Sequence, residues 1–338
     1  MTRAITSLDV ARRAGVSQSA VSRVFSGASA SAATAEKVRR AADELGYRPN
    51  QLARAMITGQ SRIIGLVVAY MDNQFYPAAL QQLSEALQAK GYHILIFTVG
   101  NAPEDVERVF EELTSFWVDG IVTASVALSS ALTARCAAAG IPIVLFNRGQ
   151  DLSGLSSVTS ANVDGGRLVA QFLIGGGHER IAHIAGWEGS STGQDRQRGF
   201  LEGLAAAGRE AHGVLPGNYD REEAAAAART LFSARDRPDA VFVANDHMAF
   251  AVMDVLRFEF GLRVPEDVSV VGYDDVPLAA WPAYALTTLR QPLSRMVTAT
   301  VETLLGQIED RARALEKIEL AGPLILRRSA RIPRGWTP

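Results

Sequence analysis

The chain has 338 residues, which is too long for one compact core and predicts two or three domains. Its composition, 48% hydrophobic and 21% charged, is typical of globular proteins and excludes a dominant disordered region. No apolar run reaches the roughly 18 residues of a membrane span, and the start of the chain lacks the apolar core of a signal peptide. A single cysteine, Cys136, excludes a disulfide framework and a cysteine-based metal site. We therefore expect a cytoplasmic protein with no membrane partner.

The net charge of −2 conceals an uneven distribution. Residues 1–60 hold nine Lys and Arg against four Asp and Glu, a net charge of +5, whereas the remainder holds 25 bases and 32 acids, a net charge of −7. A basic head on an acidic body indicates a polyanionic partner for the head alone. This signal is weak by itself, because basic patches are common on soluble proteins.

The head is expected to be helical. Thr6 and Asp9 have the spacing of a capping box, which begins a first helix that Gly15 ends. Ser17 and Ser31 are expected to cap a second and a third helix, and a glycine ends the third.

The spacing of the head also predicts a helix-turn-helix. Ala11, Gly15 and Val21 fall at its small, turn and buried apolar positions. The second helix then exposes short or planar polar groups that suit base edges in a major groove: Gln18, Ser19, Ser22 and Arg23. A helical hairpin used for protein contact is the alternative.

After the head, Pro49 and a short helical stretch at Gln51–Met56 indicate a linker. From Arg62 onward, short apolar strands alternate with amphipathic helices, which predicts parallel, doubly wound sheets. The expected strands are Ile63–Ala69, His93–Val99, Gly120–Ala124, Ile143–Phe146, Ile181–Ala185, Ala240–Ala244 and Val268–Gly272, and the expected helices include Pro77–Lys90, Asp164–Gly175, Gln194–Ala207, Arg221–Ser233 and Met248–Phe260. With a break near Ser157–Val163, this pattern fits two lobes better than one, and ligands would bind at the carboxyl ends of the strands.

Motifs along nearly the whole chain resemble the lac repressor–galactose repressor family of bacterial transcription regulators. In the head they are Asp9–Ser17, Val21–Val24, Glu36–Val38 and Glu44–Asn50. In the body they are Ile64–Val67, Asn147-Arg148, Ala244–Asp246, Val270–Asp275, Leu286–Thr288 and Gln291-Pro292.

The resemblance implies that the second helix reads the major groove and that the stretch after Pro49 folds into a hinge helix on operator DNA. Gln18 and Ser19 would read bases, and Arg23 would reach guanine. Met56 would insert into the minor groove as an apolar wedge where relatives usually have Leu, and packing of Met56 on the core is the alternative. The complete expected DNA-binding set is Thr6, Ser7, Ser17, Gln18, Ser19, Ser22, Arg23, Thr34, Asn50, Ala53 and Met56.

An effector cleft needs planar bidentate groups for hydroxyls or ring nitrogens and an aromatic ring for the apolar face of the ligand. By resemblance, the expected effector-binding residues are Phe75, Asn147, Arg148, Arg196, Tyr219, Asp246 and Asp274. As alternatives, Asp246 caps the helix that begins after it, and Arg148 is a solvated loop charge. For Arg196 and Asp274 the alternative is an ion pair across the cleft.

Three patterns suggest other chemistry. Gly189–Gly193 matches the nucleophile elbow of serine hydrolases, but Ser191 lies several residues beyond the expected strand. No convincing Asp and His follow in separate loops, because Asp246 and His247 are adjacent. Gly175–His178 resembles a phosphate loop without its lysine, so a helix-ending turn is favoured. The five histidines show no metal-ligand spacing and are interpreted as structural.

We therefore expect an N-terminal all-α helix-turn-helix domain at residues 1–48, a hinge helix and linker at 49–61, and an α/β effector-binding and dimerisation domain at 62–338. That domain would have two Rossmann-like lobes and resemble periplasmic binding proteins. The first lobe would comprise about residues 62–160 and 291–320, and the second about 161–288 and 322–330. Three crossings between the lobes are expected, near residues 160, 288–291 and 321.

The expected function is sequence-specific regulation of transcription, as the repressor of a catabolic operon, under the allosteric control of a small-molecule effector such as a sugar or sugar derivative. The expected partners are a near-palindromic double-stranded DNA operator, the effector and a second copy of the chain in a homodimer. No cofactor, metal or enzymatic activity is expected. A solute-binding protein would have no use for a basic helix-turn-helix, and an enzyme of the cleft would need a metal cluster or a catalytic triad. The identity of the effector and the sign of its control stay open.

Overall fold

The computed structural model describes residues 5–26, 29–48, 60–69, 71–99, 103–126, 128–150 and 154–336. The chain forms two compact units, residues 1–62 and residues 63–338. The expected hinge residues Asn50, Ala53 and Met56 lie outside the described residues. In the part of the chain that is described, no helix is long and apolar enough to cross a membrane.

The first unit contains three helices, α1 (Ser7–Ala14), α2 (Gln18–Ser26) and α3 (Ala32–Leu45). The capping box is present: Asp9 accepts hydrogen bonds from the Thr6 backbone N–H at 2.9 Å and from its hydroxyl at 2.7 Å. Gly15 ends α1 with a φ of 66°, a left-handed conformation that glycine adopts without steric cost. Ser31 caps α3 by accepting a hydrogen bond from the N–H of Thr34 at 3.2 Å.

The three helices of the head enclose a small apolar core. Each helix contributes to it, and the members are all less than 5% exposed: Val10, Ala11, Val21, Val38, Ala41 and Ala42. The small side chain of Ala11 lets α1 approach its neighbours closely, as the helix-turn-helix spacing predicts. Burying these positions leaves the polar face of α2 exposed.

The second unit is built on two six-stranded sheets, so the predicted two-lobed α/β fold is confirmed. The first sheet has the order β11-β5-β4-β3-β1-β2 and is parallel throughout. Its strands are β1 (Ile63–Val68), β2 (His93–Thr98), β3 (Gly120–Ala124), β4 (Ile143–Phe146), β5 (Ser156–Ser160) and β11 (Lys317–Leu320). The second sheet has the order β12-β10-β9-β8-β6-β7, with only β12 antiparallel. Its strands are β6 (Ile181–Ala185), β7 (Gly213–Pro216), β8 (Ala240–Val243), β9 (Ser269–Asp274), β10 (Thr287–Arg290) and β12 (Leu324–Ile325).

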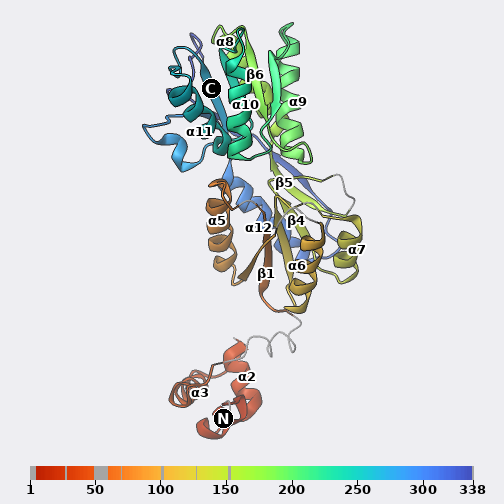
Figure 1. The fold of residues 1–338 in the computed structure, drawn as a ribbon. Helices are drawn as coiled ribbons and strands as arrows, with labels where there is room; N and C mark the ends of the chain where they lie inside the picture. Colours follow the sequence, from red (N-terminus) through yellow and green to blue (C-terminus); the bar gives the residue numbers. More distant parts are fainter. Residues whose placement is uncertain are drawn as a thin grey trace. The chain divides into compact units, whose positions relative to one another are not determined.

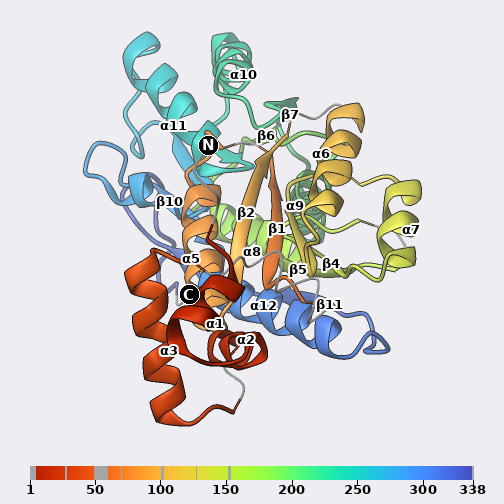
Figure 2. The ribbon, with the colours of Figure 1, turned by 90° about the horizontal axis from the view of Figure 1, so that it is seen from below.

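Helices cover both faces of each sheet, which explains why central strands such as β1, β4 and β8 are continuously apolar. Figure 2 shows α5 (Phe75–Ala89) and α12 (Leu293–Glu309) on one face of the first sheet, and α6 (Pro103–Ser115) and α7 (Ser130–Ala138) on the other. In the second lobe, α8 (Asn162–Gly175) and α9 (Ser191–Ala206) cover one face, and α10 (Arg221–Ser233) and α11 (Asp246–Asp254) cover the other (Figure 1). Successive residues of β1 point to opposite faces of the sheet, so Leu66 and Val67 belong to different core clusters.

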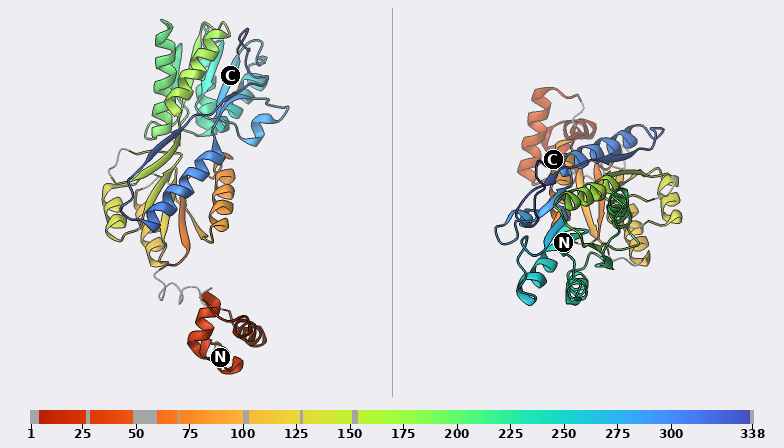
Figure 3. Two further views of the ribbon diagram at one scale, coloured as in Figure 1. Left: turned by 180° about the vertical axis from the view of Figure 1, so that it is seen from behind. Right: turned by 90° about the horizontal axis from the view of Figure 1, so that it is seen from above.

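Three segments connect the two lobes. They follow β5, β10 and β11, and the last of them carries the C-terminal part of the chain from the first sheet to the second (Figure 3). Their positions agree with the crossings expected near residues 160, 288–291 and 321. All three crossings lie between the two sheets. The lobes face each other there, and the cleft between them lies at the carboxyl ends of their strands.

The structure adds strands β5, β7, β10, β11 and β12 to the seven expected ones, and it alters one expected helix. The break expected near Ser157–Val163 is occupied in part by the fully buried strand β5. Its serines are compatible with burial because they are hydrogen-bonded; Ser156 Oγ, for example, accepts from Gln307 Nε2 at 2.6 Å and from the N–H of Glu316 at 3.0 Å. The helix expected at 248–260 is instead α11 followed by one turn of π-helix at Val255–Glu259.

Candidate functional site

The expected DNA-reading residues lie on the exposed face of α2. Gln18, Ser19, Ser22 and Arg23 are all exposed. Gln18 Nε2 donates to Ser7 Oγ at 3.0 Å, which links α2 to the start of α1. Short hydroxyl and amide groups on an exposed helix suit contacts with base edges and phosphates.

The remaining described members of the DNA-binding set lie at the starts of helices. Thr6 and Ser17 are exposed, and Ser17 Oγ accepts from the N–H of Ala20 at 3.2 Å. Thr34 is half-buried, with its hydroxyl 2.8 Å from Ser31 Oγ. Helix N-termini present unpaired N–H groups, so these positions suit phosphate oxygens.

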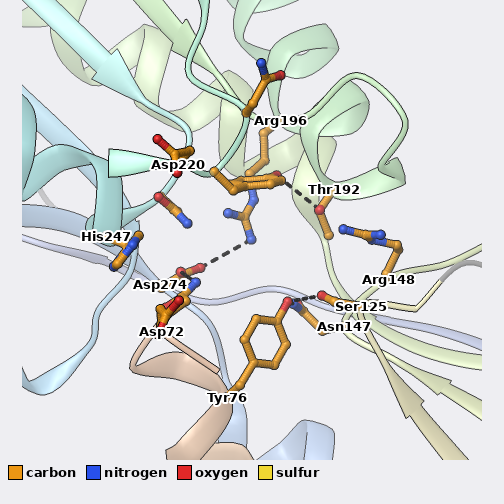
Figure 4. Close-up of a pocket in the computed structure, with 14 residues that line it drawn as sticks. Asp72, Tyr76, Ser125, Asn147, Arg148, Thr192, Arg196, Asp220, His247 and Asp274 are labelled. Atoms are coloured by element: carbon orange, nitrogen blue, oxygen red, sulfur yellow. Dashed lines mark hydrogen bonds and ion pairs between the residues drawn. The ribbon is translucent and has the colours of Figure 1, made fainter. Parts of the chain in front are cut away.

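The second candidate site is a cavity of about 140 Å³ between the two lobes. Figure 4 shows Tyr76 entering it from α5 of the first lobe, while Arg196 and Asp274 meet on the wall formed by the second. Its walls are almost entirely polar or charged, and consist of Asp72, Asn73, Tyr76, Ser125, Asn147, Arg148, Thr192, Arg196, Asn218, Tyr219, Asp220, Asn245, His247 and Asp274.

Backbone strain is concentrated at this cavity. Among the described residues, nine other than glycine have a positive φ, and five of these line it: Ser125, Asn147, Asn218, Tyr219 and Asp274. Each lies at or just after the carboxyl end of a strand. Such conformations cost of order 1–3 kcal/mol each and collect where a ligand has to be met, so the strain itself points to a binding site.

Arg196 is the central cation of the cavity and is only 2% exposed. Its Nε donates to Asn162 Oδ1 at 2.9 Å and its Nη1 to the carbonyl of Ala244 at 2.6 Å. The guanidinium also stacks on Tyr273, with Cζ 3.7 Å from the ring centroid. These contacts fix its direction before any ligand arrives.

Close packing of α8 against α9 brings Arg196 to this position. A Cβ atom on Gly166 or Gly199 would overlap the backbone of the facing helix. Only glycine therefore permits this approach, and it places the middle of α9 over the sheet.

Asp274 faces Arg196, with Oδ1 3.4 Å from Nη2. Its Oδ1 also accepts from Gln291 Nε2 at 2.7 Å, and its Oδ2 from Asn73 Nδ2 at 3.3 Å, a contact between lobes. Burial raises the pKa of the Asp274 carboxyl, and the positive charge of Arg196 opposes that shift. The ion pair considered as an alternative for these residues does form, but within the second lobe, and both partners still line the cavity.

The first lobe contributes a hydrogen-bonded group at Asn147. Its Nδ2 donates to the Tyr76 hydroxyl at 2.9 Å, and that hydroxyl also contacts Ser125. Asn147 Oδ1 is buried and has no hydrogen-bond partner among the described residues. A buried, unpaired acceptor that lines a cavity is suited to a donor on a ligand.

Two aromatic contacts complete the walls. Arg148 is buried, not solvated, and its Cζ lies 5.3 Å from the ring centroid of Trp187 on the other lobe. The Tyr219 hydroxyl lies 3.1 Å from Thr192 Oγ1. A Cβ atom on Gly186 would overlap the Tyr219 ring, so a glycine is required there.

Two expected effector-binding residues do not line the cavity. Phe75 stacks on Phe146, with ring centroids 6.3 Å apart, and is replaced in the lining by its neighbour Tyr76. Because α5 begins at Phe75, a step of one residue turns the side chain by about 100°. The sequence pattern therefore identified the turn of α5 that reaches the cavity, but not the residue on that turn whose side chain lines it.

Asp246 is the second correction, and it is fully buried behind the cavity. Its Oδ2 accepts from the N–H of Val276 at 2.9 Å and its Oδ1 from the Thr288 hydroxyl at 2.5 Å. Asn245, not Asp246, caps α11 and lines the cavity. Burial, with the nearby charge of Asp274 adding to it, raises the pKa of Asp246 well above its usual range.

Sequence reasoning missed several lining residues that share one simple feature: each comes just after a strand. Asp72 and Asn73 come after β1, Ser125 after β3, Asn218 after β7 and His247 after β8. Polar residues just beyond each expected strand would have identified most of them, because parallel strands end at the same edge. For His247, burial and the charge of Arg221 lower the pKa, so the ring is neutral at pH 7.

The patterns that suggested other chemistry have structural roles here. Ser190 caps α9 by accepting from the N–H of Gly193 at 3.1 Å, and Ser191 begins the helix. His183 is buried, and its Nδ1 lies 2.9 Å from the carbonyl oxygen of Phe242. Among the described residues, no group of three or more His, Cys, Asp or Glu is placed to hold a metal ion.

Comparison with known proteins identifies the domains that carry these two candidate sites. A family model described as bacterial regulatory proteins, lacI family, matches residues 6–50, and one described as a periplasmic binding protein-like domain matches residues 170–330. The transcriptional repressor PurR of Vibrio vulnificus is 34% identical over 323 residues, covering 94% of this chain and 96% of the relative. The transcriptional regulator CelR of Thermobifida fusca is 36% identical over 330 residues, covering 95% and 96%.

Solved structures agree over the same length. The lac repressor dimer bound to operator and the anti-inducer ONPF has a TM-score of 0.87 at 27% identity, covering 97% of this chain and 99% of the other. A complex of the transcriptional regulator CelR with cellobiose has a TM-score of 0.74 at 34% identity, covering 96% and 100%. With relatives above 30% identity along almost the whole sequence, a helix-turn-helix head and a two-lobed body, the chain belongs to the lacI family of bacterial regulatory proteins and is a DNA-binding regulator of transcription.

Proposed function

We propose that this chain is a repressor that binds a near-palindromic operator as a homodimer and is controlled by a neutral, polyhydroxylated effector, a sugar or sugar derivative, held between the lobes. The head would contact DNA through the exposed face of α2, and residues 49–61 would act as the hinge. The lac repressor dimer on its operator, a structural neighbour over 97% of this chain, supports the same arrangement.

The polar cleft centred on Arg196 and Asp274 is the observation that carries the proposal. It offers a fixed guanidinium, a fixed carboxylate and the unpaired acceptor of Asn147. Such groups pair with adjacent hydroxyls in two-point contacts. The relative CelR has been solved with cellobiose, a neutral sugar of this chemistry.

The charge of the lining favours a neutral ligand. It contains three carboxylates, on Asp72, Asp220 and Asp274, against two guanidinium groups, on Arg148 and Arg196. Each guanidinium already faces an aromatic ring, and Arg196 is paired besides. An anionic ligand would therefore meet more negative than positive charge in a poorly hydrated space.

A ligand screen tests the effector assignment. The full chain should be stabilised in thermal unfolding by at least one neutral mono- or disaccharide, with cellobiose in the panel, because a ligand at 100 times its Kd adds about 2.7 kcal/mol to the free energy of unfolding. Sugar acids, sugar phosphates, nucleosides and purines form the comparison sets. Stabilisation by purines or sugar phosphates alone would reject the neutral sugar.

A substitution in the cleft tests whether the sugar binds there or elsewhere on the protein. Asn147→Ala removes the unpaired acceptor. It should weaken the binding of the sugar identified in the screen by about tenfold, which corresponds to the loss of one buried hydrogen bond. Asn218→Ala, at the mouth of the same cavity, is the matched control for a less buried amide. Equal affinity of Asn147→Ala and the parent would place the ligand elsewhere.

A further inference from the structure

A second cavity lies at the opposite end of the first sheet. It encloses about 370 Å³ and is bordered by the end of α7, the start of β4 and the end of α12. The strands of this sheet are parallel, so they begin at this cavity and end at the effector cleft. The two cavities share no lining residue.

The cavity is cationic although the body of the chain is acidic. Arg311 and Arg313 line it, and no carboxylate is present among its described lining residues. Arg313 pairs with Glu316 at 3.2 Å on the surface, with both side chains more than a third exposed. Arg311 makes no ion pair with any described residue. Two guanidinium groups that face one carboxylate leave a positive charge at the cavity, which attracts an oxyanion.

Both guanidinium groups lie close to the backbone of a glycine. The Arg311 guanidinium lies against Gly140, which has a φ of 67°, and a Cβ atom there would overlap it. The Arg313 guanidinium lies against Gly306 of α12 in the same way. The absence of a Cβ atom at each glycine leaves room for the guanidinium group beside the backbone.

Most of the other lining residues are apolar, and Thr133 and Gln307 are the polar exceptions. Ile141, Pro142 and the buried Leu155 form its floor, and Leu315 is 53% exposed at its edge. Covering the exposed Leu315 side chain with an apolar group is favourable, because it removes apolar surface from water. We propose that this cavity is a second ligand site, for a small organic oxyanion: a carboxylate or phosphate group on a compact apolar body.

The charged group would pair with Arg311 and Arg313, and the apolar body would rest on Ile141 and Leu155. This chemistry differs from that of the effector cleft, whose lining consists of polar and charged residues, three of them aspartates, and which favours a neutral ligand. The site is therefore independent of the proposed effector.

Calorimetric titration of the full chain with phenyl phosphate and with benzoate tests the proposal, with inorganic phosphate as the probe of charge alone. We expect at least one of the two aromatic anions to bind at least tenfold more tightly than inorganic phosphate. The double variant Arg311→Gln/Arg313→Gln should weaken that binding at least tenfold. Arg108→Gln is the control, because Arg108 is an exposed arginine of α6 paired only with Asp105 in the described structure. It should bind the anion as the parent does.

Three results would overturn the site. They are no binding of either aromatic anion to the parent, equal binding by the parent and the double variant, and loss of binding in Asn147→Ala, which would place the anion in the effector cleft. The single variant Arg311→Gln, at an exposed side chain, covers the case in which the double variant unfolds. A sugar that binds the effector cleft should bind the double variant with parental affinity, so failure of this site leaves the proposed function standing.

Discussion

Arg196 and Asp274 form an ion pair in which both side chains are only 2% exposed, with Nη2 and Oδ1 3.4 Å apart. Each partner is also hydrogen-bonded by neutral groups: Arg196 by Asn162 and the carbonyl of Ala244, and Asp274 by Gln291 and Asn73. Charges withdrawn from water are tolerated only when they are paired and hydrogen-bonded in this way. The pair is therefore both a wall of the cleft and a part of the fold.

Arg196→Ala should lower the free energy of unfolding by about 3–5 kcal/mol, because it leaves the carboxylate of Asp274 buried without its cation. Urea unfolding without ligand measures the loss. Arg198→Ala is the control on the same helix: its side chain is 60% exposed and pairs with Asp195, so the change should stay within about 0.5 kcal/mol. Equal losses in the two variants would show that the buried pair contributes nothing beyond an ordinary surface contact.

Asp246 makes stability depend on pH. Its raised pKa means that it holds its proton more tightly in the folded state, so its contribution to stability falls as pH rises above the ordinary Asp value of about 4. Asp246→Asn removes that titration. The difference in free energy of unfolding, variant minus parent, should become more positive between about pH 5 and about pH 8.

The control for this titration is Asp267. Hydrogen bonds from Arg263 lower the pKa of Asp267 to about 2, so its contribution is lost only as pH falls toward that value. Asp267→Asn should therefore show a constant difference from the parent over the same pH range, measured by urea unfolding. A constant difference for Asp246→Asn as well would mean that its pKa is not raised.

Much of the fold can be predicted from local patterns, and the failures have physical causes. The strand at Gly120–Ala124 and the helix at Arg221–Ser233 have the predicted bounds, because apolar runs and caps are local signals. Strand β5 was missed because its polar residues are satisfied by distant partners, as Ser156 is by Gln307 and Glu316. Tertiary partners of this kind leave no trace in a local window.

The candidate cleft shows the same division. The residue types were predictable from the polar positions just beyond each strand, and Asn147, Arg148, Arg196, Tyr219 and Asp274 do line the cavity. The two expected residues that do not line it, Phe75 and Asp246, each lie next to a residue that does, Tyr76 and Asn245. Helix phase at a capped start depends on the exact first residue, which sequence patterns give only to within one or two positions.

Gln18 and Ser19 should determine base preference. Gln18→Ala or Ser19→Ala should alter selectivity at one or two positions in each half-site, at about 1–3 kcal/mol each, because both groups are exposed on α2. Selection of binding sites from random DNA, followed by titration at fixed salt, measures this. Non-specific affinity should change little, since it comes mainly from phosphate contacts. An unchanged selected sequence for both variants would remove α2 from base reading.

The last prediction concerns communication between the ligand and the DNA. The lobes contact each other through Asn73 and Asp274, 3.3 Å apart, and through Arg148 over Trp187. A ligand in the cleft changes the relative stability of these contacts, and it shifts the equilibrium only by its different affinity for the two closures. The proposed hinge at residues 49–61 is too short to form a stable helix alone, so its ordering should depend on that closure.

Linkage then requires the effect to be reciprocal. If the sugar found in the screen changes operator affinity by some factor, saturating operator must change sugar affinity by the same factor, for a coupling of about 1–3 kcal/mol. Calorimetric titration of the sugar with and without operator measures one side, and operator binding with and without sugar measures the other. Trp187→Ala removes an interlobe contact and should reduce the factor for operator affinity and the factor for sugar affinity together. Trp187→Phe should keep most of the coupling, because a ring remains beneath Arg148. Identical sugar affinities with and without operator would show that cleft and DNA are not coupled, even if each is bound.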